Sequence, residues 1–183
     1  MKRTICLTLA IIALAFATVC QANPGQGDVP PDFLGHDRHG DDVRISNYHG
    51  KVVIVSFWAS WCRYCLKEMP ILAAIQKKVG PDHLQVVGVN HNDDLDTFNK
   101  IRNRWKDLDV ILTYEPGDDH ISKPYGVDVL PYMVMIGRDG RIAHIHVGYG
   151  EDDLDSILAE LQDLLDAPAP PVATAANGTQ SGA

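Results

Sequence analysis

Cysteine is scarce in this 183-residue chain: four are present, too few for a small scaffold held together by disulfides. Aromatic residues make up 7% and charged residues 22%, whereas 45% are hydrophobic, so the composition is that of a globular protein with an ordinary core. Basic residues are in the minority, with 16 Lys and Arg against 24 Asp and Glu. Because a nucleic-acid-binding surface needs clustered basic residues, we do not expect nucleic acid as a partner.

The longest hydrophobic run lies at the N-terminus. Lys2 and Arg3 precede an apolar stretch from Ile5 to Val19, which is short for a membrane span and is followed by small and polar residues. We interpret residues 1–22 as a cleaved export signal, which predicts a periplasmic protein. A retained anchor helix and lipid modification at Cys20 are the alternatives, and each would attach the chain to a membrane.

The other end of the chain is also unlike a folded segment. Residues 167–183 are rich in Pro and Ala and contain no charged side chain. Such a run buries too little apolar surface to offset the entropy of ordering it, so we expect a disordered tail. Residues 23–166 remain as one folded domain.

Removal of the signal segment would leave two cysteines, Cys62 and Cys65, spaced as Cys-x-x-Cys. A disulfide across so few residues constrains the unfolded chain very little, so stability is a poor reason to keep it. A structural zinc site needs four ligands, and the sequence has no second Cys pair or spaced His pair to complete one. Two inert core thiols are the remaining alternative, but in an exported protein the spacing favours a redox pair.

Hydrophobic patterns between the two ends alternate between strand and helix. Strands are predicted at 52–57, 84–89, 110–113, 132–137 and 142–147, after a hairpin at about 30–46. Helices are predicted from the cysteine pair to Gly80, at 95–105 and at 154–165. The order β-β-β-α-β-α-β-β-β-α indicates an α/β sandwich with a central mixed sheet.

The two cysteines occupy different positions on the first predicted helix. Cys62 opens the helix, where the terminal N–H groups and the helix dipole favour a thiolate. Arg63 adds a positive charge, so we expect a low pKa for the Cys62 thiol; a solvated surface charge is the alternative for Arg63. Cys65 lies one turn later, where it would be more buried and could resolve a mixed disulfide formed at Cys62.

The segment Phe57–Cys65, FWASWCRYC, resembles the active-site segment of the thioredoxin superfamily. Further segments resemble the TlpA/ResA-like exported thiol–disulfide oxidoreductases: 47–51, 67–70, 87–90, 125–127, 130–131 and 139–140. The resemblance covers about residues 30–166. It implies a thioredoxin-like three-layer α/β/α sandwich with a central mixed sheet and an N-terminal β-hairpin extension.

The resemblance also implies roles at matching positions. Cys62 matches the nucleophile and Cys65 the resolving thiol. Pro131 matches a cis-proline beside the disulfide, and the backbone of the preceding residue, Leu130, matches the segment that pairs with substrate. Trp61 is expected to shield the disulfide and shape a docking surface together with Trp58, and plain packing is the alternative for both tryptophans.

Other positions are expected to tune the redox chemistry. Arg63 and Tyr64 lie between the cysteines, where the resemblance implies control of the reduction potential. Glu68 matches an acid that influences cysteine pKa values in some relatives, and an exposed helix carboxylate is the alternative. The chain departs from the pattern at Ser56, which replaces the buried acid of cytoplasmic thioredoxins, and at Val129, where a glycine is common.

Two other groups of side chains could bind a metal. His144 and His146 share one face of a strand, with Met133 or Met135 on its neighbour, and a half-solvated strand face is the alternative. The second group comprises His91, Asp93, Asp94 and Asp96. A solvated helix start, where acids suit the dipole, is the alternative for that group.

Together these features predict a periplasmic oxidoreductase that exchanges a Cys62–Cys65 dithiol with cysteines of exported proteins. The resemblance implies reduction, for instance of apocytochrome c or copper-site cysteines, with electrons from a membrane thiol transporter. A copper metallochaperone that uses the same cysteines is one alternative, although such relatives usually space their cysteines more widely. A peroxiredoxin-type peroxidase is another, but the chain lacks a separate Thr-x-x-Cys site. We expect no cofactor.

Overall fold

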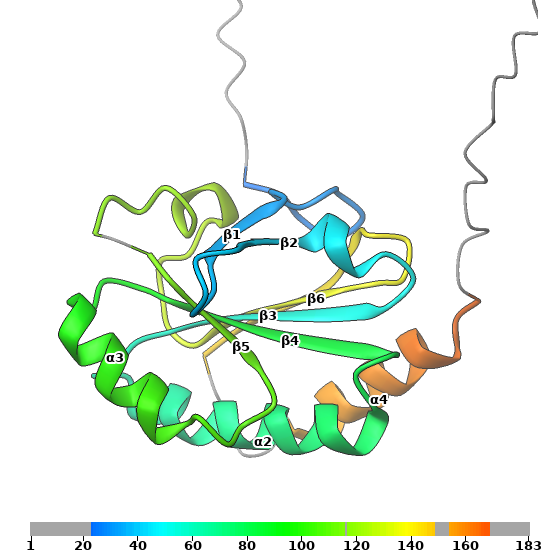
Figure 1. The fold of residues 1–183 in the computed structure, drawn as a ribbon. Coiled ribbons are helices and arrows are strands. Elements are labelled where there is room, and N and C mark those ends of the chain that lie inside the picture. The colour runs from blue at the N-terminus through cyan, green and yellow to red at the C-terminus, as the bar shows by residue number, and fades with distance from the viewer. Residues whose placement is uncertain (1–22, 116, 149–153, 169–183) are drawn as a thin grey trace, which may run out of the picture.

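A computed structural model describes residues 23–115, 117–148 and 154–168 (Figure 1). The predicted signal segment, with Cys6 and Cys20, lies outside these residues, as does the predicted tail beyond Pro168. None of the helices in the described part combines the length and apolarity needed to cross a membrane.

Seven strands form one mixed sheet in the order β2-β1-β5-β4-β3-β6-β7. The strands are β1 (Phe33–His36), β2 (Asp42–Arg44), β3 (Val52–Trp58), β4 (Leu84–Asn90), β5 (Ile111–Tyr114), β6 (Tyr132–Ile136) and β7 (Ile142–Val147). The central strands β3, β4 and β5 are parallel, whereas β6 and the β1-β2 hairpin join antiparallel. The predicted order of elements, the mixed sheet and the hairpin extension are confirmed.

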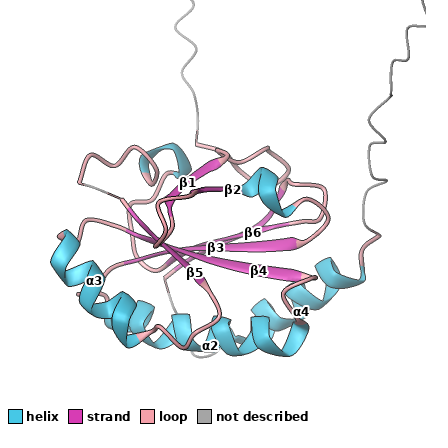
Figure 2. Cartoon of the chain, in the orientation of Figure 1, coloured by secondary structure: helices cyan, strands magenta, loops and turns pink. Residues whose placement is uncertain are grey.

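Three α-helices lie along one face of the sheet (Figures 1 and 2). They are α2 (Arg63–Val79), α3 (Leu95–Arg104) and α4 (Leu154–Asp166). The short 3-10 helices η1 (Ile45–Tyr48) and η2 (Lys123–Tyr125) lie on the opposite side. The thioredoxin-like α/β sandwich is confirmed, with α-helices in one outer layer and short helices in the other.

Strand β3 separates two hydrophobic clusters, and all seven of its residues are buried. Ile54 and Trp58 pack towards the helices, in the cluster that includes both cysteines. Val55 and Phe57 point to the other side. This alternation follows from the period of two along a strand, and it explains why a strand covered on both faces is apolar throughout.

Strand direction brings the site segments together. Because β3 and β4 are parallel, with Trp58 opposite Asn90, both strands end at the same edge of the sheet. Strand β6 runs the other way and begins at that edge, with Tyr132 opposite Phe57. The segments that follow β3 and β4 and the one that precedes β6 are therefore neighbours.

Candidate redox site

Cys62 and Cys65 form a disulfide at the start of α2, with their Cα atoms 5.3 Å apart. Cys62 is the N-cap residue, and its Sγ accepts a hydrogen bond of 3.1 Å from the backbone N–H of Cys65. Cys62 is 7% exposed, whereas Cys65 is fully buried. When the bond is reduced, the same N–H and the helix dipole would favour a thiolate at Cys62, the more accessible sulfur.

A buried carboxylate anchors the loop that leads from β3 to Cys62. The Oδ2 atom of Asp93 accepts hydrogen bonds from the backbone N–H of Ser60 at 2.8 Å and from Asn90 Nδ2 at 2.7 Å, and Oδ1 accepts one from Ser60 Oγ at 2.7 Å. The expectation of a solvated helix start is therefore wrong for Asp93. It is confirmed for Asp94, which is exposed and caps α3.

Glu68 lies one helical turn after Cys65 and is buried, so the exposed helix carboxylate is ruled out. Its Oε2 atom accepts a hydrogen bond of 2.8 Å from Ser56 Oγ. Burial raises the pKa of Glu68 from 4.5 to about 7, and the Ser56 hydrogen bond and the charge of His146 partly oppose that rise. Ser56 stands where cytoplasmic thioredoxins have a buried acid. Its hydroxyl donates to another buried acid, Glu68, which α2 supplies.

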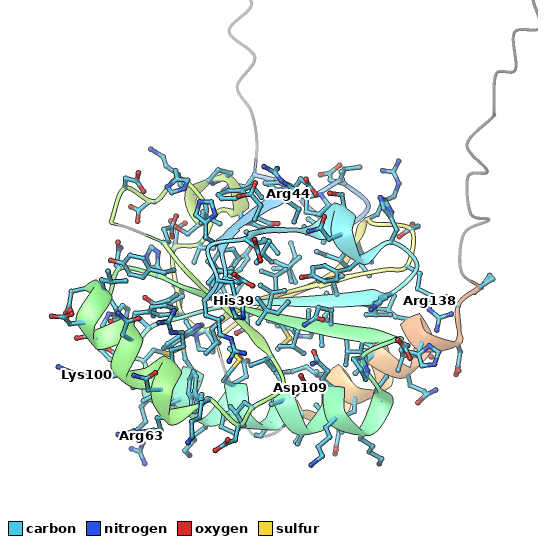
Figure 3. The ribbon with its side chains drawn as sticks, in the orientation of Figure 1. His39, Arg44, Arg63, Lys100, Asp109 and Arg138 are labelled. Carbon is cyan, nitrogen blue, oxygen red and sulfur yellow. A yellow bond between two sulfur atoms is a disulfide. The ribbon has the colours of Figure 1, made fainter. Side chains whose placement is uncertain are left out.

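The remaining residues around the disulfide divide into buried and exposed ones. Trp58 is fully buried and packs 4.9 Å from the Trp105 ring, so plain packing describes it. Trp61 and Tyr64 are 67% and 50% exposed and leave apolar surface beside the sulfurs. Arg63 is exposed and points outward from the start of α2 (Figure 3).

The segment before β6 lies at the edge of the sheet where β3 ends. The Leu130–Pro131 peptide bond is cis, as the resemblance implied. Pro131 is buried, Leu130 is partly buried and Val129 is 54% exposed. The pairing of β6 with β3 places this segment beside the end of the strand that leads to Cys62.

Comparison with known proteins agrees with this geometry. The Redoxin family model matches residues 25–161. The chain belongs to the redoxin family. It is 26% identical over 152 residues to the thiol-disulfide oxidoreductase ResA of Geobacillus thermodenitrificans, covering 80% of this chain and 86% of that protein. It is 30% identical over 123 residues to the thioredoxin-like protein YneN of Bacillus subtilis, covering 67% and 72%.

A solved structure is also similar. The Chlorobium tepidum protein provisionally designated thiol:disulfide interchange protein DsbE has a TM-score of 0.68 and 27% identity, over 78% of this chain and 99% of that one. With the Cys62–Cys65 pair in place, these relatives identify the redoxin as a thiol–disulfide oxidoreductase.

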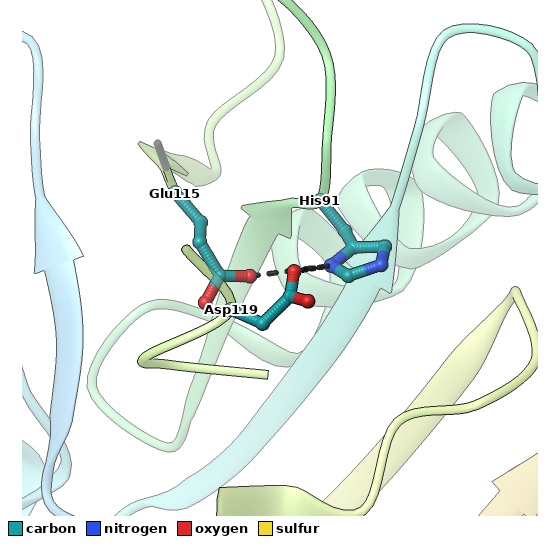
Figure 4. A group of neighbouring side chains, drawn as sticks. All are labelled: His91, Glu115 and Asp119. Carbon is teal, nitrogen blue, oxygen red and sulfur yellow. Dashed lines mark hydrogen bonds and ion pairs between the residues drawn. The ribbon is translucent and has the colours of Figure 1, made fainter. Parts of the chain in front are cut away.

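A second cluster of polar side chains lies at the edge of the sheet where β4 and β5 end (Figure 4). His91 Nδ1 is 3.3 Å from Oε2 of Glu115 and 3.8 Å from Oδ1 of Asp119. The three atoms lie within 4.8 Å of one another and could hold a divalent cation. Glu115 is fully buried, and its other oxygen accepts the backbone N–H of Ser122 at 2.9 Å. The contact with His91 therefore offsets part of the cost of burying the Glu115 carboxylate.

The acids considered beside His91 as a possible cation site are therefore not its contacts, because the sheet order brings Glu115 and Asp119, which follow β5, to it. Neither Asp93, which binds Ser60, nor Asp94, which caps α3, belongs to the groups of potential metal ligands in the described part of the chain.

The two histidines of β7 face the helices. His146 lies opposite Met133 and His144 opposite Met135, and both methionines are buried. His146 Nε2 is 2.7 Å from Oε2 of Glu160, and His144 Nδ1 is 3.5 Å from Oε1. Among the described residues, neither histidine belongs to a group of three potential metal ligands. Contacts of both histidines with Glu160 of α4 describe this face.

The sequence analysis did not predict Asn90 as a site residue, and it considered Asp93 as a metal ligand rather than as the acceptor that holds Ser60. A signal was available, because both lie at or after the end of a strand parallel to the one that leads to Cys62. Polar side chains in that place gather at the carboxyl edge of the sheet.

Proposed function

We propose that this redoxin is a periplasmic oxidoreductase that reduces disulfides of other exported proteins. The observation that carries the proposal is the asymmetry of the redox pair: a slightly exposed sulfur at the N-terminus of α2 is bonded to a fully buried one. The export signal predicted at residues 1–22 supports the location, and the ResA relatives support the class of reaction.

The proposed reaction transfers two electrons from the dithiol to a substrate disulfide. The Cys62 thiolate attacks one substrate sulfur to form a mixed disulfide, and the other substrate sulfur leaves and takes up a proton. Cys65 then loses its proton to Glu68, and its thiolate attacks Cys62 Sγ. The Cys62–Cys65 disulfide forms, and the second substrate sulfur is released. A membrane thiol transporter would return the protein to the dithiol state.

Substrate docking is assigned to the exposed apolar surface around the disulfide. Trp61 directly precedes Cys62 and is exposed, as is Val129, which precedes Leu130 and Pro131. Aromatic and aliphatic side chains that remain exposed beside a reactive centre favour contact with a partner. Apocytochrome c and copper-site proteins are the substrates that we infer, because both need reduced cysteines before their cofactor binds.

The first test measures insulin reduction by the wild-type protein and by Cys62→Ser. We expect the variant to lose turnover. A wild-type protein that binds copper stoichiometrically but reduces no disulfide would support the metallochaperone instead.

The direction of electron flow is tested by the reduction potential. A value of about −250 mV or lower supports a reductant, whereas a value of about −120 mV would mark an oxidant.

Partners are tested with Cys65→Ser in periplasmic extracts. This variant can form a mixed disulfide at Cys62 but cannot resolve it, so substrates should be recovered as covalent complexes and identified by mass spectrometry. Cys62→Ser/Cys65→Ser is the matched control, and equal recovery from both variants would contradict the proposal.

A further inference from the structure

Three side chains that can bind a metal converge where β4 and β5 end, and none of them belongs to the redox pair (Figure 4). The Nδ1 atom of His91 lies 3.3 Å from Oε2 of Glu115 and 3.8 Å from Oδ1 of Asp119. His91 directly follows β4, whereas the two acids follow β5. The parallel pairing of these strands therefore brings one imidazole and two carboxylates together.

The two oxygens of the Glu115 carboxylate have different partners. Oε1 accepts the backbone N–H groups of Ile121 and Ser122 at 2.5 and 2.9 Å, so this oxygen holds the chain that follows β5. Oε2 faces His91 instead. Because Glu115 is fully buried, its negative charge needs a partner, and the single ring proton on Nδ1 is the one that the contact with His91 can offer.

Asp119 contributes an acidic oxygen that this ring proton does not satisfy. Its Oδ1 atom is shielded from solvent and has no hydrogen-bond partner within the described part of the chain, since 3.8 Å to His91 is too long for one. Two carboxylate oxygens thus share one ring nitrogen, an excess of negative charge that a divalent cation would offset. The side chain as a whole is 45% exposed, so solvent reaches the cluster on this side.

The spacing of the three atoms suits a single ion. Zinc lies about 2.0–2.2 Å from nitrogen and oxygen ligands, so two ligands of a tetrahedral site are about 3.3–3.6 Å apart. The separation of His91 and Glu115 lies within this range, and Asp119 would approach it by a small rotation of its side chain. Three protein ligands leave the fourth position to water. An imidazole ligand favours zinc and similar transition ions, whereas magnesium and calcium prefer oxygen alone.

We propose that His91, Glu115 and Asp119 form a binding site for a divalent transition-metal ion such as zinc, separate from the disulfide. The inference goes beyond the proposed function and does not depend on it, because no thiol binds the ion and no electron passes through it. The ion would fasten the chain after β5 to the end of β4. The N–H of His91 also donates to the carbonyl of Trp58 at 2.8 Å, so the bound ion would brace the edge where β3 ends.

Binding would move a proton within the His91 ring. Asn92 Nδ2 lies 3.0 Å from Nε2, and an amide N–H only donates, so without an ion the neutral ring carries its proton on Nδ1, towards Glu115. An ion at Nδ1 requires that proton on Nε2, where the amide oxygen of Asn92 would accept it after the amide turns over. The NMR shifts of the two ring nitrogens therefore report on this site directly.

The test adds zinc to the oxidised protein, in which Cys62 and Cys65 are bonded to each other and offer no thiolate. The ring proton of His91 should move from Nδ1 to Nε2 as zinc is added, and calorimetry should give the affinity. Magnesium at the same concentration should leave the ring unchanged. A wild-type protein whose His91 signals do not respond to zinc would overturn the inference.

Asp119→Asn and Asp118→Asn are a matched pair, because each removes one carboxylate charge from neighbouring positions. Asp118 pairs with His120, and these two form with Glu115 a second group of potential ligands, so the pair also distinguishes the two groups. Zinc affinity should fall at least about 10-fold in Asp119→Asn and change less than about 2-fold in Asp118→Asn. Equal losses in the two variants would overturn the inference.

His91→Gln is the second variant, followed by calorimetry, and its zinc affinity should also fall at least about 10-fold. An affinity equal to that of wild type in either His91→Gln or Asp119→Asn would place the ion elsewhere and overturn the inference.

Discussion

The two sulfurs of the redox pair differ because of their places along one helix. Cys62 precedes the first turn, where backbone N–H groups lack partners, and Cys65 lies inside that turn against the core. Glu68, one turn after Cys65, is the first acidic residue of α2. Spacing within a single helix therefore gives the two sulfurs different surroundings, as the proposed roles of Cys62 as nucleophile and Cys65 as resolving thiol require.

Glu68 should make the stability of the oxidised protein fall with rising pH. Its pKa is about 7 in the folded protein, against 4.5 ordinarily, so the unfolded chain loses this proton first. Protonated Glu68 therefore stabilises the folded protein fully below pH 4.5, and this contribution is lost as the pH rises to about 7. Urea unfolding at the two ends of this range measures the effect. The free energy of unfolding of the wild type should fall by about 3 kcal/mol, whereas that of Glu68→Gln should not. Parallel pH profiles for the two proteins would contradict this prediction.

Asp93 should determine how firmly the loop before Cys62 is held. Asp93→Ala leaves the donors of Ser60 and Asn90 without their acceptor, so we expect a loss of about 1–3 kcal/mol in the free energy of unfolding. Hydrogen exchange of the Ser60 amide should also accelerate. Asp96→Ala, which removes an exposed acid from the first turn of α3, is the control and should cost at most about 1 kcal/mol.

At the scale of elements, helix α2 must lie very close to strand β4. A Cβ atom at Gly88 would lie 2.7 Å from Met69 Cε and 2.9 Å from Leu112 Cδ2. Glycine in the strand therefore leaves room for the methionine that packs α2 onto the sheet. The same helix ends at Gly80, as the sequence predicted, with a φ of 98° and an N–H bonded to the carbonyl of Gln76.

The close approach of α2 predicts that Gly88→Val lowers the free energy of unfolding by about 1–3 kcal/mol, because both neighbours must move. Gly25→Ala is the control, since the nearest atom to its added Cβ is Asp28 Oδ2 at 3.9 Å. Chemical unfolding of the two variants measures the difference. A Gly88→Val protein as stable as Gly25→Ala would show that the contact is not restrictive.

At the scale of the whole molecule, the sheet divides the core into two clusters, and the cysteines belong only to the one under the helices. Met133→Ala and Ile136→Ala each truncate a buried side chain of β6, on opposite faces, and each should cost about 2–5 kcal/mol. Only Met133→Ala should also change the rate at which reduced Cys62 is alkylated. Equal alkylation rates in both variants would contradict the separation of the faces.

Much of the architecture could be predicted because it depends on local patterns. The apolar runs of β3 and β4 and the glycine after α2 are visible within a few residues. The contact of Ser56 with Glu68 and that of His91 with Glu115 were not visible, because they join elements whose adjacency depends on helix orientation and strand order. The redox pair was recognisable because both of its members lie within one short motif.

The strand order also determines how a polypeptide can reach the sulfurs. Strand β3, which leads to Cys62, has β4 on one side and β6 on the other, so no incoming chain can extend the sheet beside it. The open edges of the sheet are β7, which lies beyond β6, and β2, a three-residue strand that begins with Asp42 and ends with Arg44 and is a poor template for pairing. A client of the proposed oxidoreductase would therefore approach the sulfurs at the end of β3, beside the end of β4 and the start of β6, rather than along the strand.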